Sequence, residues 1–153
     1  MRRSLFQILT CFLVISLFSS VQSCREDKPF EVIVIDTQEE LENLLLSNQS
    51  DRYEGDLILS GNITSLQALS SLKKLFGKLA IIDTQITSLN GLENLILVTD
   101  DITITSTGPI QQNITNFCAI QGLLEGGSFK SLTITNNLFN PSVQEIIDGD
   151  CSL

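Results

Sequence analysis

The sequence predicts a β-solenoid of short parallel strands, with an α-helical cap at each end. The main observation is one pattern written twice: residues 55–59, 63–66 and two further leucines recur as residues 77–81, 86–89 and two further leucines. The two copies are 22 residues apart at the first leucine (57 to 79) and 23 at a later one (66 to 89). Repeats of this period bury their apolar side only by stacking on their neighbours. The other observation is that a strand–helix pattern precedes the repeats and a helical pattern follows them.

Residues 1–23 have the composition of a secretory signal peptide. Arg2 and Arg3 precede an apolar run over residues 5–18, and small and polar residues follow at 19–23. The run is short and charged residues soon follow it, which favours a cleaved signal over a retained anchor helix. We therefore expect the protein to be exported.

Cys24 follows this segment directly and predicts the form of export. Residues 21–24 resemble a bacterial lipobox, in which the cysteine is lipidated and becomes the first residue of the mature chain, although Gln22 departs from the usual small residue. Residues 24–30 would then form a polar tether to an outer or cell-surface membrane. The alternative is cleavage after Ser23 by an ordinary signal peptidase, which would release a secreted protein.

The charge and the cysteines limit the possible partners. The full chain carries a formal charge of −9, and removal of two arginines with the signal leaves 7 − 18 = −11. Such a surface repels phosphate backbones, so we expect no nucleic-acid partner. Cys118 and Cys151 remain in the expected domain, and two cysteines in an exported domain most often pair as a disulfide. A metal site is the alternative, but the chain has no histidine to complete it.

The expected domain, residues 31–153, begins with its N-terminal cap. Residues 31–36 are rich in β-branched side chains and predict a strand. Thr37 and Glu40 then form a Ser/Thr-x-x-Glu capping signature, which predicts a helix with Leu41, Leu44 and Leu45 on one face. The polar residues 47–54 predict a loop.

Each repeat contains a short strand that directs two side chains inward. The four inward pairs are Leu57/Leu59, Leu79/Ile81, Ile102/Ile104 and Leu132/Ile134. A polar residue follows each pair by three positions: Asn62, Thr84, Thr107 and Asn137. We expect these polar side chains to satisfy backbone groups at the turns, one repeat after another.

The third repeat runs over residues 101–124 and contains an insertion centred on residues 108–109. Insertions of this kind go to surface loops, so this loop and residues 125–127 are candidate functional loops. Residues 131–135 predict the fourth strand. Asn140 and Pro141 then predict the start of the C-terminal helix, with Gly149 at its end.

The combination of Gly-x-Leu-x-Ile with Ile-Thr-Ser-Leu-x-x-Leu-x-x-Leu, over residues 54–138, resembles the receptor L domain. The sequences Phe117-Cys118 and Asn140-Pro141, the latter followed by Asp148-Gly149-Asp150-Cys151, resemble the bacterial cell-surface versions of that family. The resemblance implies a right-handed, leucine-rich-repeat-like β-solenoid. It also implies a binding role, although a fold alone is weak evidence of function.

Candidate catalytic groups are sparse. Without histidine, the common Ser and Cys nucleophile systems are excluded, and we expect no enzymatic activity, metal or cofactor. Asp56, Lys78 and Asp101 precede successive strands, which predicts a cross-strand charge match. An acid/base pair involving Asp100 or Asp101 is a minor alternative. Asp148 and Asp150 lack the further ligands of a calcium loop.

The sequence instead predicts a flat face of small and β-branched side chains. Its members are Ile58, Ser60, Ala80, Ile82, Thr103, Thr105, Thr133 and Thr135. Such residues suit sheet packing alone, and they also suit contact with a protein or glycan partner at the cell surface. We therefore expect a non-enzymatic binding or adhesion module, with a structural domain lacking its own ligand as the alternative and a carbohydrate-active enzyme a distant third. Asn48, Asn62 and Asn113 match the N-glycosylation pattern, which applies only in a eukaryote.

Overall fold

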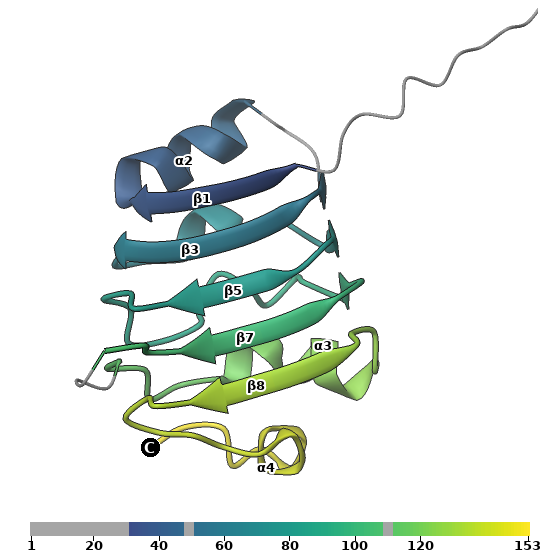
Figure 1. Ribbon diagram of the computed structural model, residues 1–153. Helices are drawn as coiled ribbons and strands as arrows, with labels where there is room; N and C mark the ends of the chain where they lie inside the picture. Colours follow the sequence, from purple (N-terminus) through teal and green to yellow (C-terminus); the bar gives the residue numbers. More distant parts are fainter. Residues whose placement is uncertain (1–30, 48–50, 109–111) are drawn as a thin grey trace, which may run out of the picture.

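The computed structural model describes residues 31–47, 51–108 and 112–153. The predicted signal (1–23) and tether (24–30), with Cys24, lie outside the described residues. The described chain forms a mixed α/β fold with two parallel sheets (Figure 1). The larger sheet has the strand order β1-β3-β5-β7-β8, and the smaller has the order β2-β4-β6.

The strands alternate with short helical segments along the chain. The strands are β1 (Val32–Thr37), β2 (Arg52–Glu54), β3 (Asp56–Asn62), β4 (Lys74–Phe76), β5 (Leu79–Ile82), β6 (Leu97–Val98), β7 (Asp101–Thr105) and β8 (Ser131–Thr135). The α-helices are α2 (Gln38–Ser47), α3 (Gln121–Glu125) and α4 (Val143–Asp148), and the 3₁₀ turns are η1 (Gln67–Leu69) and η2 (Cys118–Ile120).

The register of the larger sheet confirms the predicted inward pairs. Leu57 lies beside Leu79, which lies beside Ile102 and then Leu132. The second members of the pairs align in the same way, and β1 adds Ile33 and Ile35 to the two rows. Each row therefore places one aliphatic side chain of every strand on the inner face, where full burial of such a side chain contributes about 1.5–3 kcal/mol. Ile33, Leu132 and Ile134, on the two edge strands, are only partly buried.

The remaining apolar positions of the repeats complete the core. Residues at equivalent positions of the repeats are all buried: Ile63/Ile86/Ile114, Leu66/Leu89/Phe117, Leu69/Leu92/Ile120, Leu72/Leu95/Leu123 and Leu75/Val98. The third repeat is the longest, yet Asn116 still bridges to Ser88 of the second. The expected equivalence of residues 86–89 and 114–117 is thus confirmed. Part of the expected insertion loop, residues 109–111, lies outside the described residues.

The smaller sheet corrects one expectation. Residues 52–54 belong to strand β2 and not to a loop, with Arg52, Tyr53 and Glu54 beside Lys74, Leu75 and Phe76 of β4. Only Tyr53 of β2 is buried, and its side chain supplies the apolar contact. The polar composition of a three-residue strand hid this pairing, because one buried side chain leaves too little periodicity to recognise.

The N-terminal strand and helix form as expected. The Thr37 hydroxyl accepts the Glu40 N–H at 3.2 Å, which caps α2. The Glu40 carboxylate accepts the N–H of Asp36 (3.3 Å), one residue before the expected Thr37 N–H. Leu41 is fully buried and Leu44 half-buried, whereas the side chain of Leu45 lies outside what is described.

The C-terminal helix begins later than expected. Asn140 and Pro141 do not start it; Ser142 is the N-cap of α4, and its hydroxyl accepts the Glu145 N–H while the Glu145 carboxylate accepts the Ser142 N–H. This reciprocal pair satisfies two N–H groups at once. The Asn140 amide oxygen instead accepts a hydrogen bond from the N–H of Asn137 at 2.9 Å. Gly149 ends α4 in the left-handed conformation, as expected.

The disulfide between Cys118 and Cys151 is present and joins the third repeat to the chain beyond α4. The N–H of Phe117 also donates to the carbonyl of Cys151 at 2.8 Å. The C-terminal end of the core is therefore held by a covalent link and a backbone hydrogen bond at adjacent residues.

A chain of buried amides follows the carboxyl ends of three strands of the larger sheet. Gln112 accepts the N–H and the hydroxyl of Thr84 at 2.8 Å each, and its own amide nitrogen donates to Asn137 at 3.3 Å. Asn137 donates in turn to the carbonyl of Ile104 at 3.2 Å. The expected relay of polar side chains therefore includes Thr84 and Asn137, but Gln112 takes the place predicted for Thr107. Asn62 is exposed and accepts a hydrogen bond from Gln85 at 2.8 Å.

Candidate binding face of the larger sheet

The outer face of the larger sheet carries all eight side chains that the sequence analysis assigned to a partner face. Two rows cross the strands: Ile58, Ala80, Thr103 and Thr133 in one, and Ser60, Ile82, Thr105 and Thr135 in the other. Figure 1 shows this face toward the viewer with no helix over it, and α3 behind the sheet. The predicted rows are thus brought together as two continuous lines of neighbours.

The character of this face changes from one strand to the next. Its N-terminal part is aliphatic apart from Ser60, with Val32 and Val34 of β1 56% and 61% exposed and Ile58 and Ile82 half-buried. Ala80, predicted for the partner face, is buried at 2% exposure. Within the two rows its C-terminal part carries only threonines, and the Thr105 and Thr135 hydroxyls hydrogen-bond each other at 2.8 Å. The face therefore combines an apolar contact area with a hydroxyl-bearing one on a single rigid sheet.

The acidic residues at the amino ends of the strands do not match the arrangement expected for them. Lys78 binds Asp56 through its backbone N–H (2.7 Å), while the ammonium group that meets the acids is that of Lys130. Lys130 lies 2.8 Å from Asp100 and 3.5 Å from Asp101. The Lys78 match is wrong because the short Asp56 side chain reaches the neighbouring backbone first.

This charge cluster also argues against acid/base chemistry. The hydrogen bond from Lys130 holds the pKa of the Asp100 carboxyl below its usual value, and Asp100 in turn raises the pKa of Lys130. A general acid at neutral pH needs its carboxyl pKa raised. The arrangement instead keeps both groups charged and matched across neighbouring strands.

The opposite, carboxyl-terminal edge of the strands contains a turn that the sequence analysis missed. Asp83 follows β5 with φ of 54° and accepts hydrogen bonds from the Ser106 hydroxyl (2.7 Å), the Thr107 N–H (2.8 Å) and the Thr107 hydroxyl. These donors, the Thr107 hydroxyl first, lower the pKa of Asp83. Asn136 follows β8 with the same φ and donates to the Ser106 carbonyl. Aspartate and asparagine directly after a strand are the signal that indicates such left-handed positions.

No protein-family model, curated protein or solved structure matches this chain.

Two absences apply only to the residues that the structure describes. Among them, no group of three potential metal-ligating side chains lies together, and no helix is both long and apolar enough to span a membrane. Asp148 and Asp150, considered above for calcium, flank the left-handed Gly149 that ends α4. The candidate site therefore rests on the outer face of the sheet.

Proposed function

We propose that this chain is a non-enzymatic binding or adhesion module whose outer sheet face contacts a protein or glycan partner. It is exported and held at an outer or cell-surface membrane through a lipid on Cys24. Its repeats form a right-handed, leucine-rich-repeat-like β-solenoid capped by helices, related to the receptor L domain. The observation that carries the proposal is the outer face itself: the eight predicted side chains lie in two adjacent rows with no described helix over them, and all of them except the buried Ala80 are at least partly exposed.

The physical character of the face suits contact without chemistry. The hydrogen-bond ladder and the buried inner rows fix the sheet backbone. The surface therefore loses little conformational entropy when a partner binds it. Ile58 and Ile82 supply apolar area, and the threonine hydroxyls supply donors and acceptors for a polar partner. The negative charge of the chain, −9, disfavours nucleic acid.

A structural domain without its own ligand is the second candidate. The hydrogen bond between the Thr105 and Thr135 hydroxyls favours this candidate, because each hydroxyl already has a partner within the sheet. A screen separates the two candidates: the purified protein is applied to a glycan array and to a panel of extracellular proteins. Each hit is then measured with Ile82→Glu and, as a matched control, with Ile96→Glu, which changes an exposed isoleucine (52%) beside β6 of the smaller sheet.

The expected result is a partner whose affinity falls at least tenfold with Ile82→Glu and less than twofold with Ile96→Glu. A complete absence of partners, or hits weakened only by Ile96→Glu, would remove the binding proposal and leave the structural one. Far-UV circular dichroism of both variants confirms that each is folded before it is scored.

The membrane anchor is tested separately. Intact mass and detergent partitioning of the mature protein are compared with those of a Cys24→Ser variant. A diacyl or triacyl mass increment that the variant loses supports the anchor. An unmodified mass beginning at residue 24, or a retained segment 1–23, would show a freely secreted or helix-anchored protein instead.

A further inference from the structure

The larger sheet ends at β1 with an edge that no described element pairs with. Residues 32–35 of this edge are Val-Ile-Val-Ile, and the register is regular until the shift between Ile35 and Thr37. Edge strands are normally protected by lysine, proline, a bulge or a covering element. Within the described residues the first four positions of β1 contain no lysine, proline or bulge, and α2 lies on the side of Ile33 and Ile35 without pairing with the edge. Among these residues the edge is therefore open to strand pairing.

The direction of the backbone groups shows which of them are available. The carbonyl of Glu31 accepts the N–H of Asp56 (2.8 Å), so alternate residues, Glu31, Ile33 and Ile35, direct their groups toward β3. The N–H and C=O groups of Val32 and Val34 therefore point away from the sheet. The next outward N–H, that of Asp36, already donates to Glu40. An added strand thus meets two residues whose outward backbone groups pair with no described strand, and beyond them the Asp36 N–H, which is already bonded.

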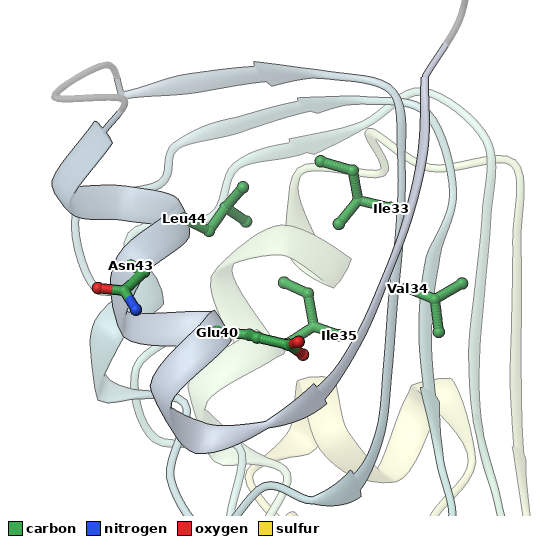
Figure 2. Close-up of a pocket in the computed structure, with 6 residues that line it drawn as sticks. All are labelled: Ile33, Val34, Ile35, Glu40, Asn43 and Leu44. Carbon is green, nitrogen blue, oxygen red and sulfur yellow. The ribbon is translucent and has the colours of Figure 1, made fainter.

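An apolar pocket of about 240 Å³ lies beside this edge, between β1 and α2. Its lining residues are Ile33, Val34, Ile35, Glu40, Asn43 and Leu44. Figure 2 shows Ile33 and Ile35 on the side of β1 that faces α2 and Leu44, and Val34 on the opposite side. Because side chains alternate along a strand, an added strand would place every second side chain on the pocket side and the others beside Val32 and Val34.

The charges around the pocket select the occupant. Residues 31–47, which include β1 and α2, contain no lysine or arginine. They carry five exposed acidic residues: Glu31, Asp36, Glu39, Glu40 and Glu42. A second copy of this chain would bring the same acids, and antiparallel pairing of two β1 strands would set Glu31 near the partner's acidic end. Like charges placed so are repulsive. In an aliphatic segment flanked by basic residues, the aliphatic side chains would fit the apolar pocket and the basic ones would pair with the acids around it.

We propose that the β1 edge and its pocket bind an extended aliphatic peptide segment flanked by lysine or arginine, by strand addition. Backbone hydrogen bonds to Val32 and Val34 would hold the segment, and the pocket and the acids would select its side chains. This edge site is independent of the outer-face binding proposed above, so either can fail without the other.

The probe is a capped, dye-labelled peptide, Lys-Thr-Leu-Thr-Leu-Thr-Lys, titrated with the purified protein by fluorescence anisotropy. A peptide with glutamate at both ends is the charge control. Two N-methylated versions, each methylated along one edge of the peptide, test strand addition without altering the protein. We expect saturable binding of the basic peptide, at least tenfold weaker binding of the acidic one, and loss of binding for only one of the two methylated versions.

Variants of the protein test the location. Val34→Pro removes an outward N–H from β1, and Val34→Lys adds a charge at the same exposed position; Thr133→Lys, at the exposed middle residue of the opposite edge strand β8, is the matched control for the lysine variant. Val34→Pro and Val34→Lys should each weaken binding at least tenfold, and Thr133→Lys less than twofold. If Val34→Pro does not fold, the comparison of Val34→Lys, which adds the charge natural edges use, with Thr133→Lys decides the location.

Several results would overturn the proposal. These are equal binding of the basic and acidic peptides, equal effects of the two methylation patterns, or equal effects of Val34→Lys and Thr133→Lys. Concentration-dependent dimerisation by light scattering that Val34→Lys abolishes would assign the edge to a second copy of the chain instead.

Discussion

Substitution of Gly77 by alanine tests how closely successive repeats approach one another. A Cβ atom at residue 77 would lie 2.1 Å from the carbonyl oxygen of Gly55, 2.5 Å from its carbonyl carbon and 3.0 Å from the nitrogen of Asp56. All three are backbone atoms of the preceding repeat, so no side chain can rotate away. Gly77 is not among the glycines with positive φ, so the expected cost comes from this contact and not from backbone conformation.

Relief of this contact requires the two backbones to separate by about 1 Å, which is the shortfall from an ordinary carbon–oxygen distance. The hydrogen bond from the N–H of Gly55 to Phe76 (3.0 Å) and that from the N–H of Lys78 to Asp56 (2.7 Å) span the same boundary. A shift of this size would break at least one of them. Overpacking costs about 1–3 kcal/mol and a lost buried hydrogen bond a similar amount, so Gly77→Ala should lower the free energy of unfolding by about 3–5 kcal/mol.

Urea and thermal unfolding, followed by far-UV circular dichroism, measure this change. A loss of this size corresponds to a fall in Tm of roughly 10–20 °C for a domain of this length. Gly122→Ala is the matched control: residue 122 lies in α3, and its Cβ would meet nothing within 4 Å. We expect that control to be neutral or stabilising by up to about 1 kcal/mol. If Gly77→Ala stays within about 0.5 kcal/mol of the wild type, the close approach of the repeats is wrong.

Three further predictions concern the disulfide, an acidic turn and a buried hydroxyl. Replacement of Cys118 and Cys151 together by alanine should lower the free energy of unfolding by about 3–4 kcal/mol, because the bond closes a separation of 33 residues; an unchanged urea midpoint under oxidising conditions would contradict this. Asp83, whose folded-state pKa is depressed, stabilises the fold above its ordinary pKa of 3.8, and this contribution is lost as the pH falls through the lower folded value. The Tm difference between wild type and Asp83→Asn should therefore be greatest near neutral pH and disappear in strong acid; a difference that does not vary with pH would refute the assignment. The Tyr53 hydroxyl is buried with no partner among the described residues, and burial raises its pKa to about 12, so stability should fall as the pH rises from 10 toward 12. Tyr53→Phe should be neutral or stabilising by up to about 1 kcal/mol at pH 7 and should remove the alkaline loss, as denaturant titrations at both pH values will show.

The rows of the larger sheet were predictable because the alternation of apolar residues and the period of the repeats agree there. Alternation of aliphatic residues defines the strand, and the 22- to 23-residue period fixes which strand lies beside which. Leu57, Leu79 and Ile102 are neighbours for this reason. The disulfide followed from the expectation of export together with the cysteine count. Long-range features with a repeated or paired signature are thus accessible from sequence.

The errors fall where a single local contact decides the outcome. Arg52–Glu54 forms a strand through one buried tyrosine, and α4 begins at Ser142 because its capping pair with Glu145 is better satisfied than a start at Asn140. Gln112 replaces Thr107 in the buried relay because the third repeat is longer and its chain returns to the core later. Such choices depend on which side chain reaches a given backbone group, and spacing does not specify this.

The candidate site shows the same division. The eight side chains of the outer face followed directly from alternation, since residues between inward ones must point outward. The open edge of β1 and the pocket beside α2 did not, because they depend on the relative position of a strand and a helix. The Asp83 turn escaped notice for the same reason, since its donors come from the next repeat.

The most direct test of the account is photo-crosslinking from the outer face in the presence of a partner found by the screen. Benzoylphenylalanine is placed at position 82 in one protein and at position 96 in another, both occupied by isoleucine in the wild type. We predict that position 82 crosslinks the partner with at least tenfold higher yield than position 96. Equal yields, or crosslinking from position 96 alone, would contradict the claim that the outer face of the larger sheet is the binding surface.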